Sequence, residues 1–221
     1  MAMLDRALVR VLPAVPRSVV RRISNRYIAG TTLADAVRVV KQLNADGKTA
    51  TVDVLGEETR TRRETLDIVR AYHDVFEAIE RERLDSNVSI KLTALGLNLA
   101  YELCRANLFK VVRHAAESGN FVRIDMEDSS TTSETLELYR ELRDEGLDNV
   151  GVVLQAALRR SIRDIHALAP LRPNVRLVKG IYVPYGEHWY RYSLRRLQEN
   201  PKIAGYVASD TLNRLFGADG R

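Results

Sequence analysis

The chain has 221 residues, 45% hydrophobic and 29% charged, which is typical of a folded globular protein with one main domain. No apolar run approaches the roughly 20 residues that a membrane-spanning helix needs. The single cysteine, Cys104, excludes an internal disulfide and fits a reducing cytoplasm, where we expect it to be buried filler. The sequence contains no phosphate-binding loop and no dinucleotide-binding glycine motif, and its four histidines lack metal-ligand spacing.

The net charge of +5 is concentrated at the N-terminus. Residues 1–26 carry six arginines and one aspartate, which leaves 28 of the 34 basic and 28 of the 29 acidic residues in the rest of the chain. We therefore divide the chain into a basic helical arm, residues 1–30, and a neutral body, residues 31–221, on which the arm packs. Contact with anionic lipid and a targeting role are alternatives for this arm. The body has no basic stripe with interleaved aromatic residues, which argues against nucleic acid as a partner.

Helical and extended segments alternate along the body. Thr31 or Thr32 is expected to cap a first helix that ends near Gly47. Capping-box patterns precede two later helices, at Thr61–Glu64 and at Thr131–Glu134. The remaining helices are predicted at residues 100–116, 161–168 and 187–199.

Five short apolar runs lie between these helices, and each carries charged or amide side chains. They are Thr49–Leu55 with Asp53, Val88–Thr93 with Lys91, Phe121–Glu127 with Asp125 and Glu127, Val150–Ala156 with Gln155, and Val175–Tyr182 with Arg176 and Lys179. Strands that alternate with helices predict an α/β fold of parallel strands covered by helices. The carboxyl ends of such strands are where α/β barrels and sheets bind their ligands. A closed barrel needs eight strands, and the pattern stops at five.

Asp125 and Glu127 are two residues apart, so they point the same way from the third predicted strand, and Lys91 comes from the neighbouring second strand. Isolated buried charge is costly, so these groups must pair with one another or with a ligand. A structural cluster of ion pairs and a site for a zwitterion or a flavin are both open interpretations.

Near the C-terminus, Tyr192, Arg195 and Arg196 have three- and four-residue helical spacing. Two adjacent guanidinium groups suit a carboxylate ligand. A solvated basic face of a helix is the alternative.

Taken together, these residues resemble the proline dehydrogenase family. The resemblance runs from about Arg26 to Asn200 and is carried by the segments Arg26–Gly30, Ser89–Thr93, Val122–Asp128, Val153–Gln155, Arg176–Gly180 and Tyr192–Arg196. It implies a (β/α)8-type barrel that binds FAD at the carboxyl ends of its strands. It also implies an enzyme that oxidises L-proline to 1-pyrroline-5-carboxylate and passes the electrons to a quinone at the membrane surface. Further implications are 1-pyrroline-5-carboxylate dehydrogenase as a partner and a cytoplasmic protein peripheral at the inner membrane surface.

The resemblance also implies a role for each site residue. Asp125 and Arg176 would be the catalytic groups. Substrate would be bound by Lys91, Tyr192, Arg195 and Arg196, with the two arginines on the proline carboxylate. The flavin would be lined by Met126, Gln155, Lys179, Gly180 and Ile181, and no metal is implied. Ile181 stands where the family usually has alanine.

The segment Val178–Gly186 departs most from the family pattern. It joins the end expected for a fifth strand, Lys179–Tyr182, directly to the end expected for an eighth, Val183–Gly186. At ~30 residues per strand–helix unit, roughly 80 residues are absent. We therefore expect a barrel shortened to five or six strands, with weakened flavin binding and self-association through its open edges. A flavin-free, inactive remnant of the enzyme, another flavin barrel with a different substrate and a membrane-surface binding module are the alternatives.

Overall fold

The computed structural model describes residues 28–56, 59–156, 158–177 and 182–185, the last group by its backbone alone. The basic arm up to residue 27, the segment 178–181 and the predicted helix 187–199 lie outside the described residues. No helix among the described residues is long and apolar enough to cross a membrane.

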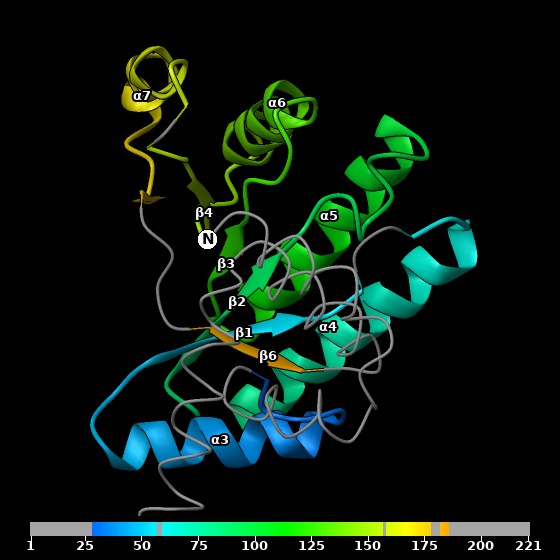
Figure 1. Ribbon diagram of the computed structural model, residues 1–221, viewed down its shortest axis with the longest axis vertical. Helices are drawn as coiled ribbons and strands as arrows, with labels where there is room; N and C mark the ends of the chain where they lie inside the picture. Colours follow the sequence, from blue (N-terminus) through cyan, green and yellow to red (C-terminus); the bar gives the residue numbers. More distant parts are fainter. Residues whose placement is uncertain (1–27, 57–58, 157, 178–181, 186–221) are drawn as a thin grey trace, which may run out of the picture.

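The described strands form one sheet in which every pair is parallel, as the alternation of strands and helices predicts (Figure 1). In chain order they are β1 (Ala50–Val54), β2 (Ser86–Ile90), β3 (Val122–Ile124), β4 (Val150–Val153), β5 (Val175–Arg176) and β6 (Tyr182–Tyr185). Their order across the sheet is β5-β4-β3-β2-β1-β6. From β1 to β5 each strand is added in chain order on the same side of β1, as in a β/α barrel. Strand β6 lies on the other side of β1.

Helices follow the first four strands and lie along the outer side of the sheet (Figure 1). They are α4 (Arg62–Glu82), α5 (Tyr101–Glu117), α6 (Thr132–Asp144) and α7 (Ser161–Leu168), which continues into the short 3-10 helix η2 (Ala169–Leu171). Helix α3 (Leu33–Ala45) precedes β1 and lies beside β6 and α4. The expected helices at 100–116 and 161–168 are confirmed to within one residue.

The hydrophobic core lies between the sheet and these helices. Alternate strand residues are apolar and buried, and they pack with fully buried helix residues such as Tyr72, Phe76 and Leu108. The strand residues of this layer are Val52, Val54, Val88, Ile90, Val122, Ile124, Val150 and Val152. Because side chains alternate across a strand, the other face of the sheet carries the residues in between. On that face Asp53, Ser89, Arg123 and Gly151 lie in one register across β1 to β4.

Two of the predicted helix starts are confirmed and one is wrong in its detail. Thr32 caps α3 in a capping box with Asp35. At the start of α4 the Thr61 side chain accepts a hydrogen bond from the Glu64 N–H, but the Glu64 carboxylate accepts from the Arg60 N–H, so the box predicted there is only half formed. Thr131 precedes α6 without capping it. Its backbone is helical (φ −95°, ψ −6°), so its hydroxyl instead donates to the Asp128 carbonyl.

The predicted fifth strand, Val175–Tyr182, is divided between the two edges of the sheet. Val175 and Arg176 form β5 beside β4, whereas Tyr182 begins β6, which pairs with β1 through Thr51. In a closed barrel the last strand pairs with the first. The position of β6 therefore agrees with the interpretation that Val183–Gly186 corresponds to the eighth strand of the family, and Tyr182 belongs with it.

Arg123 anchors the β5 edge to the sheet. Its guanidinium donates to the backbone carbonyl and to the side-chain Oδ1 of Asn174, both at 2.8 Å, and stacks over the Phe121 ring. It crosses Gly151 on the intervening strand, where an added Cβ would lie 2.5 Å from Arg123 Nη1, 2.6 Å from the Asn174 carbonyl and 2.7 Å from Phe121. Only glycine leaves room for this arrangement.

Gly151→Ala should therefore lower the free energy of unfolding by about 1–3 kcal/mol through overpacking, measured by urea denaturation. Gly119→Asn is the control, because an added Cβ at Gly119 would have no neighbour within 4 Å. Gly119 has φ +62°, a conformation that asparagine tolerates. We expect the control to stay within about 0.5 kcal/mol of the parent chain. Equal stability of Gly151→Ala would show that the Arg123 anchor has room to shift.

Two histidines stack between α4 and α5. The rings of His73 and His114 are 4.1 Å apart and inclined by 22°. Burial and, second, the His114 ring lower the pKa of His73, while the carboxylates of Glu77, Asp74 and Glu117 act in the opposite direction. Both rings occupy the helix–helix contact, so a proton on His73 disfavours the folded state.

The unfolding free energy should accordingly fall as the pH drops below about 6.5, the pKa of histidine in an unfolded chain. In that range the unfolded chain binds a proton that folded His73 resists, so stability rises with pH. His73→Phe keeps a ring in the stack and should flatten the pH dependence, measured by urea denaturation between pH 5.5 and 7.5. An unchanged slope in the variant would assign the dependence to other groups.

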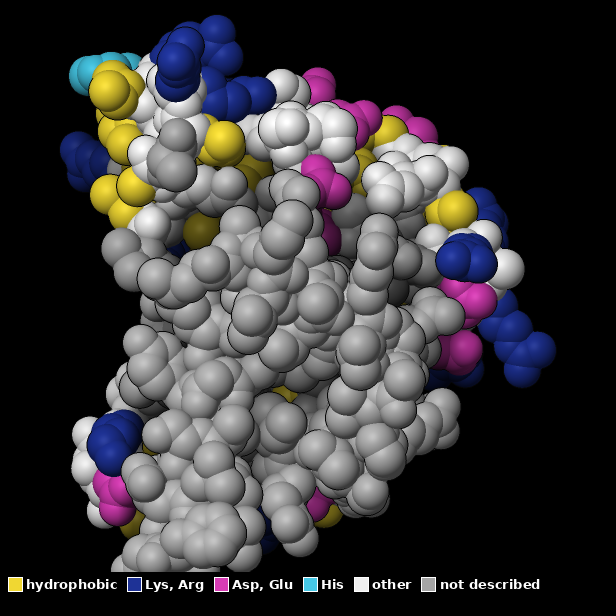
Figure 2. Space-filling view, in the orientation of Figure 1, with side chains coloured by type: hydrophobic (Ala, Val, Ile, Leu, Met, Phe, Trp, Pro, Cys, Tyr) yellow, Lys and Arg dark blue, Asp and Glu magenta, His cyan; other side chains and the backbone are white. Residues whose placement is uncertain are grey.

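Helix α7 is the most exposed of the described helices that follow a strand. Ile162 and Ile165 are 70% and 39% exposed, and Leu177, just beyond β5, is 47% exposed. Figure 2 shows hydrophobic and basic side chains gathered in the upper left, where Figure 1 places α7. The apolar side chains at this end of the sheet lack a covering layer among the described residues.

Candidate active site

Asp53 and Lys91 form a buried ion pair between adjacent strands. Asp53 lies in β1, Lys91 directly follows β2, and the lysine Nζ is 2.6 Å from both carboxylate oxygens. The side chains are only 3% and 11% exposed. Burial lowers the pKa of Lys91, but the carboxylates of Asp53 and Asp125 outweigh it, so the pKa lies well above its ordinary value. Lys91 is therefore a permanently charged group at neutral pH.

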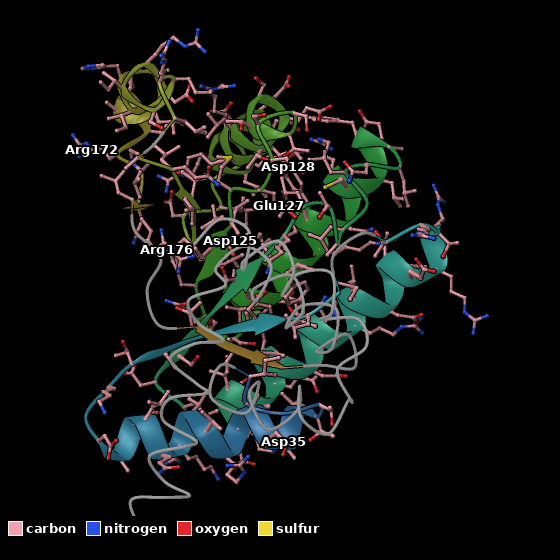
Figure 3. The ribbon with its side chains drawn as sticks, in the orientation of Figure 1. Asp35, Asp125, Glu127, Asp128, Arg172 and Arg176 are labelled. Atoms are coloured by element: carbon pink, nitrogen blue, oxygen red, sulfur yellow. The ribbon has the colours of Figure 1, made fainter. Side chains whose placement is uncertain are left out.

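Asp125 continues this arrangement towards the β5 edge. It follows β3 and binds the Arg176 guanidinium of β5 through Oδ1 at 2.6 Å (Figure 3). Its other carboxylate oxygen, Oδ2, lies 3.9 Å from Lys91 Nζ. Arg176 also approaches the Ser89 hydroxyl at 3.4 Å. Four charges thus alternate in sign in the ion-pair row, which consists of Asp53, Lys91, Asp125 and Arg176.

The ion-pair row explains how a parallel sheet tolerates charge on its inner face. Each of its four groups is buried or nearly so, and burial of a single charge would be prohibitive. Alternation makes the row neutral overall, which offsets much of the desolvation cost. The row also lies at the carboxyl ends of the strands, the edge at which parallel sheets bind ligands.

A second polar row lies one step further along the strands. The Thr93 N–H and hydroxyl both donate to the Glu127 carboxylate, at 3.0 and 2.5 Å. Burial raises the pKa of Glu127, although the two bonds from Thr93 act to lower it. Glu127 thus joins the segments that follow β2 and β3.

Met126 and Gln155 stand beside this second row. Met126 is 4% exposed. The half-buried Gln155 donates its amide N–H groups to the backbone carbonyls of Met126 and Glu127, both at 3.3 Å. Because the side-chain nitrogen of Gln155 is engaged, its side-chain oxygen Oε1 is the atom that can accept a hydrogen bond from a ligand.

The structure brings together five of the site residues expected from the sequence, namely Lys91, Asp125, Met126, Gln155 and Arg176. The other six, Lys179, Gly180, Ile181, Tyr192, Arg195 and Arg196, lie outside the described residues. Sequence reasoning missed Asp53 and Ser89 as members of the site. The position of Asp53 at the end of an apolar strand, like that of Lys91, was the signal that pointed to it.

Cys104 takes no part in the site. It is fully buried on α5, its Sγ lies 3.4 Å from the Leu92 carbonyl, and burial raises the pKa of its thiol. This confirms the expectation of a buried structural cysteine. Within the described ranges, no group of three or more histidine, cysteine or acidic side chains is arranged to hold a metal ion.

The sheet is parallel, helices cover one of its faces, and the other face carries a row of paired charges. These features define the class of the protein, an α/β fold of the barrel type with a polar site. A family model for proline dehydrogenase matches residues 36–183. The chain belongs to the proline dehydrogenase family.

Individual relatives agree with this assignment. Proline dehydrogenase 1 of Bacillus subtilis subsp. natto is 40% identical over 159 residues, which cover 72% of this chain and 52% of the relative. The proline dehydrogenase of Deinococcus radiodurans is 34% identical over 165 residues, or 73% of this chain and 53% of the relative. The chain spans about half the length of these curated relatives.

A solved structure shows the same fold. The crystal structure of proline utilization A from Bdellovibrio bacteriovorus, inactivated by N-propargylglycine, superimposes with a TM-score of 0.65 at 25% identity. The similarity covers 82% of this chain and 22% of that one. This confirms the expected fold class, an α/β fold of the barrel type found in proline utilization A.

Proposed function

We propose that the chain is an FAD-dependent proline dehydrogenase that oxidises L-proline to 1-pyrroline-5-carboxylate. The observation that carries the proposal is the ion-pair row, which holds Lys91, Asp125 and Arg176 together at the ligand-binding edge of the sheet. Oxidation of the proline ring removes two electrons and two protons and leaves a C=N bond. FAD, when bound, supplies the two-electron acceptor for this chemistry.

The described residues suit a flavin in charge and polarity. A reduced flavin ring carries excess negative charge, and Arg176 offers a fixed cation whose position is set by its 2.6 Å bond to Asp125. Gln155 presents a carbonyl acceptor beside the buried, apolar Met126. We assign the cofactor to these residues together with Lys179, Gly180 and Ile181.

Substrate recognition is assigned to the basic groups. Lys91 is held in its charged form by Asp53 and would place a fixed positive charge near an anionic substrate. Arg195 and Arg196 would bind the proline carboxylate, and Tyr192 would pack against its ring. A quinone at the membrane surface is the proposed electron acceptor, and 1-pyrroline-5-carboxylate dehydrogenase the consumer of the product. This assignment makes the chain a cytoplasmic protein that visits the inner membrane surface.

The open sheet favours a second candidate, a flavin-free and inactive remnant of the enzyme. In the described part of the chain, β5 and β6 end the sheet on either side. A closed β/α barrel builds its ligand site from the segments that follow eight strands, so the six described strands offer fewer contacts. Ile181, which the family resemblance assigns to the flavin, is also bulkier than the alanine usual at that position.

Flavin binding separates the two candidates. We expect weak binding of FAD, seen as a flavin spectrum at saturating cofactor that is lost on gel filtration, with bleaching of the bound flavin by L-proline under anaerobic conditions.

Arg195→Met and Arg196→Met should each weaken proline binding by more than about tenfold and leave flavin affinity unchanged. Absence of flavin binding at any concentration would support the remnant, and unaltered proline binding in both variants would remove the arginines from the site.

A further inference from the structure

The Glu127–Thr93 pair repeats the geometry of the ion-pair row one step further along the same strands. Ile90 and Ile124 are register partners in β2 and β3. Continuing that register places Lys91 opposite Asp125, whose charged atoms are 3.9 Å apart, and Thr93 opposite Glu127, which are hydrogen-bonded. The second pair therefore determines how the segments carrying the first pair lie relative to one another.

Glu127 is suited to this position as an acceptor. Its two carboxylate oxygens each take one hydrogen from Thr93, so both donors of that residue are satisfied by one side chain. The tight turn that follows Lys91 is anchored at the same place, because the Leu95 N–H donates to the Lys91 carbonyl and the Gly96 N–H to that of Thr93. Loss of the Glu127 contact would remove the two bonds that tie the Thr93 N–H and hydroxyl to the segment after β3.

Glu127 is connected to the segments after β1 and β4 through Thr93 and through its own backbone carbonyl. The buried Thr59 hydroxyl, from the segment after β1, donates to the Thr93 carbonyl at 2.9 Å. On the other side, Gln155 of the segment after β4 donates to the Glu127 carbonyl. Thr59, Thr93, Glu127 and Gln155 thus form a hydrogen-bonded belt that crosses the carboxyl ends of four consecutive strands. Figure 3 shows Glu127 beyond Asp125 on the segment that leaves β3.

We propose that Glu127 is a positioning residue of the active site, which holds Lys91 against Asp125 through Thr93 and sets the orientation of Gln155 and Met126. Its carboxylate does not contact substrate or cofactor in this assignment. The inference rests on the proposed function for its consequence in catalysis, but the positioning of Lys91 is a property of the protein alone. Exposed Asp128, the next acidic residue, has no contact with Thr93 among the described residues.

The test measures the accessibility of Lys91 in the full chain. Acylation with acetic anhydride, quantified by mass spectrometry, should modify Lys91 slowly and the exposed Lys110 quickly. Glu127→Ala should raise the Lys91 rate relative to Lys110 by about tenfold. Thr93→Val, which removes only the hydroxyl, should raise it less. Glu127→Gln should restore slow labelling, because the amide keeps one acceptor and the Thr93 hydroxyl can turn to accept from its nitrogen.

Two controls separate positioning from general loss of stability. Asp128→Asn should leave the Lys91 rate unchanged. Leu138→Ala, in the core on α6, should lower the thermal midpoint without a selective rise at Lys91. If Glu127→Ala and Thr93→Val both leave the Lys91 rate unchanged relative to Lys110, or match Leu138→Ala, the proposal is overturned.

FAD affinity provides the second readout, measured by quenching of flavin fluorescence. Glu127→Ala should weaken it by about tenfold through Gln155 and Met126, and Glu127→Gln should not. If the parent chain binds no FAD, the proposed function fails, whereas the Lys91 rates still decide whether Glu127 positions the ion-pair row. Unchanged FAD affinity in Glu127→Ala would remove Gln155 and Met126 from the proposal.

Discussion

Replacing Asp53 with asparagine is expected to lower the free energy of unfolding by about 3–5 kcal/mol. Lys91 Nζ lies 2.6 Å from both Asp53 oxygens and is nearly buried. Asparagine has almost the same shape but no charge, so the lysine would keep its ammonium in a poorly solvated site. The remaining carboxylate, Asp125 at 3.9 Å, is already bonded to Arg176. The measurement is urea denaturation at pH 7.

The matched variants test whether charge balance causes the loss. Lys91→Met alone should be costly as well, because it leaves Asp53 buried without its cation. Asp53→Asn combined with Lys91→Met removes one charge of each sign, and Asp125 with Arg176 remains a balanced pair. The double variant should therefore lose clearly less than the sum of the two single losses. Additive losses would show that packing of the two side chains, and not their charges, sets their contribution.

The direction in which the pKa of Lys91 is shifted determines the pH at which this experiment is done. A cation whose folded pKa is raised contributes stability that is fully present below its unfolded pKa, about 10.4, and that is lost as the pH rises through the folded value. The contribution of Lys91 should hence be constant from pH 6 to 9. The pH dependence of stability that His73 introduces is expected below about pH 6.5. Measurements between pH 7 and 9 therefore report on the ion pair without it.

The sequence predicted the scaffold well where periodicity and caps act locally. Three of the first four predicted strands contain an observed one, and the second, Val88–Thr93, overlaps β2, which begins two residues earlier and ends at Ile90. The helix at 161–168 has the predicted ends. Thr32 and Thr61 cap their helices because their backbones are extended, which lets the side chain turn back to the helix. Thr131 begins a similar sequence pattern but has a helical backbone, so the capping-box prediction failed there. Local sequence does not determine that backbone angle.

The site was harder to predict because it depends on distances between strands. Lys91 and Asp125 were expected to meet since their strands are consecutive, and they lie within 3.9 Å. The pairing of Asp53 with Lys91 depends on the register of β1 against β2, and the apolar alternation does not distinguish registers that differ by two residues. Tyr182 could not be assigned to a strand end, because only the placement of β6 beside β1 distinguishes the two.

The open sheet should also make the protein self-associate as its concentration rises. Among the described strands, β5 and β6 each have one neighbour in the sheet, so each presents an edge that a closed barrel would pair. Leu177, which directly follows β5, and Ile162, on the helix that precedes it, are exposed apolar side chains. Unpaired strand edges and exposed apolar side chains both promote association between chains. Static light scattering over a concentration series should show a mass that rises from 25.0 kDa towards at least twice that value.

Charged substitutions at the β5 end should reduce this association, because a lysine on an edge disfavours pairing with another chain. Ile162→Lys with Leu177→Lys is expected to keep the mass near that of a single chain at concentrations where the parent associates. Leu66→Lys is the control, since Leu66 is 38% exposed, a fraction close to that of Leu177, but lies on α4, which packs against β1 and β2 and away from the β5 edge. It should leave the association unchanged. A monomer at all concentrations, with a sharp thermal transition that does not depend on concentration, would contradict the prediction and indicate that the shortened barrel closes on itself.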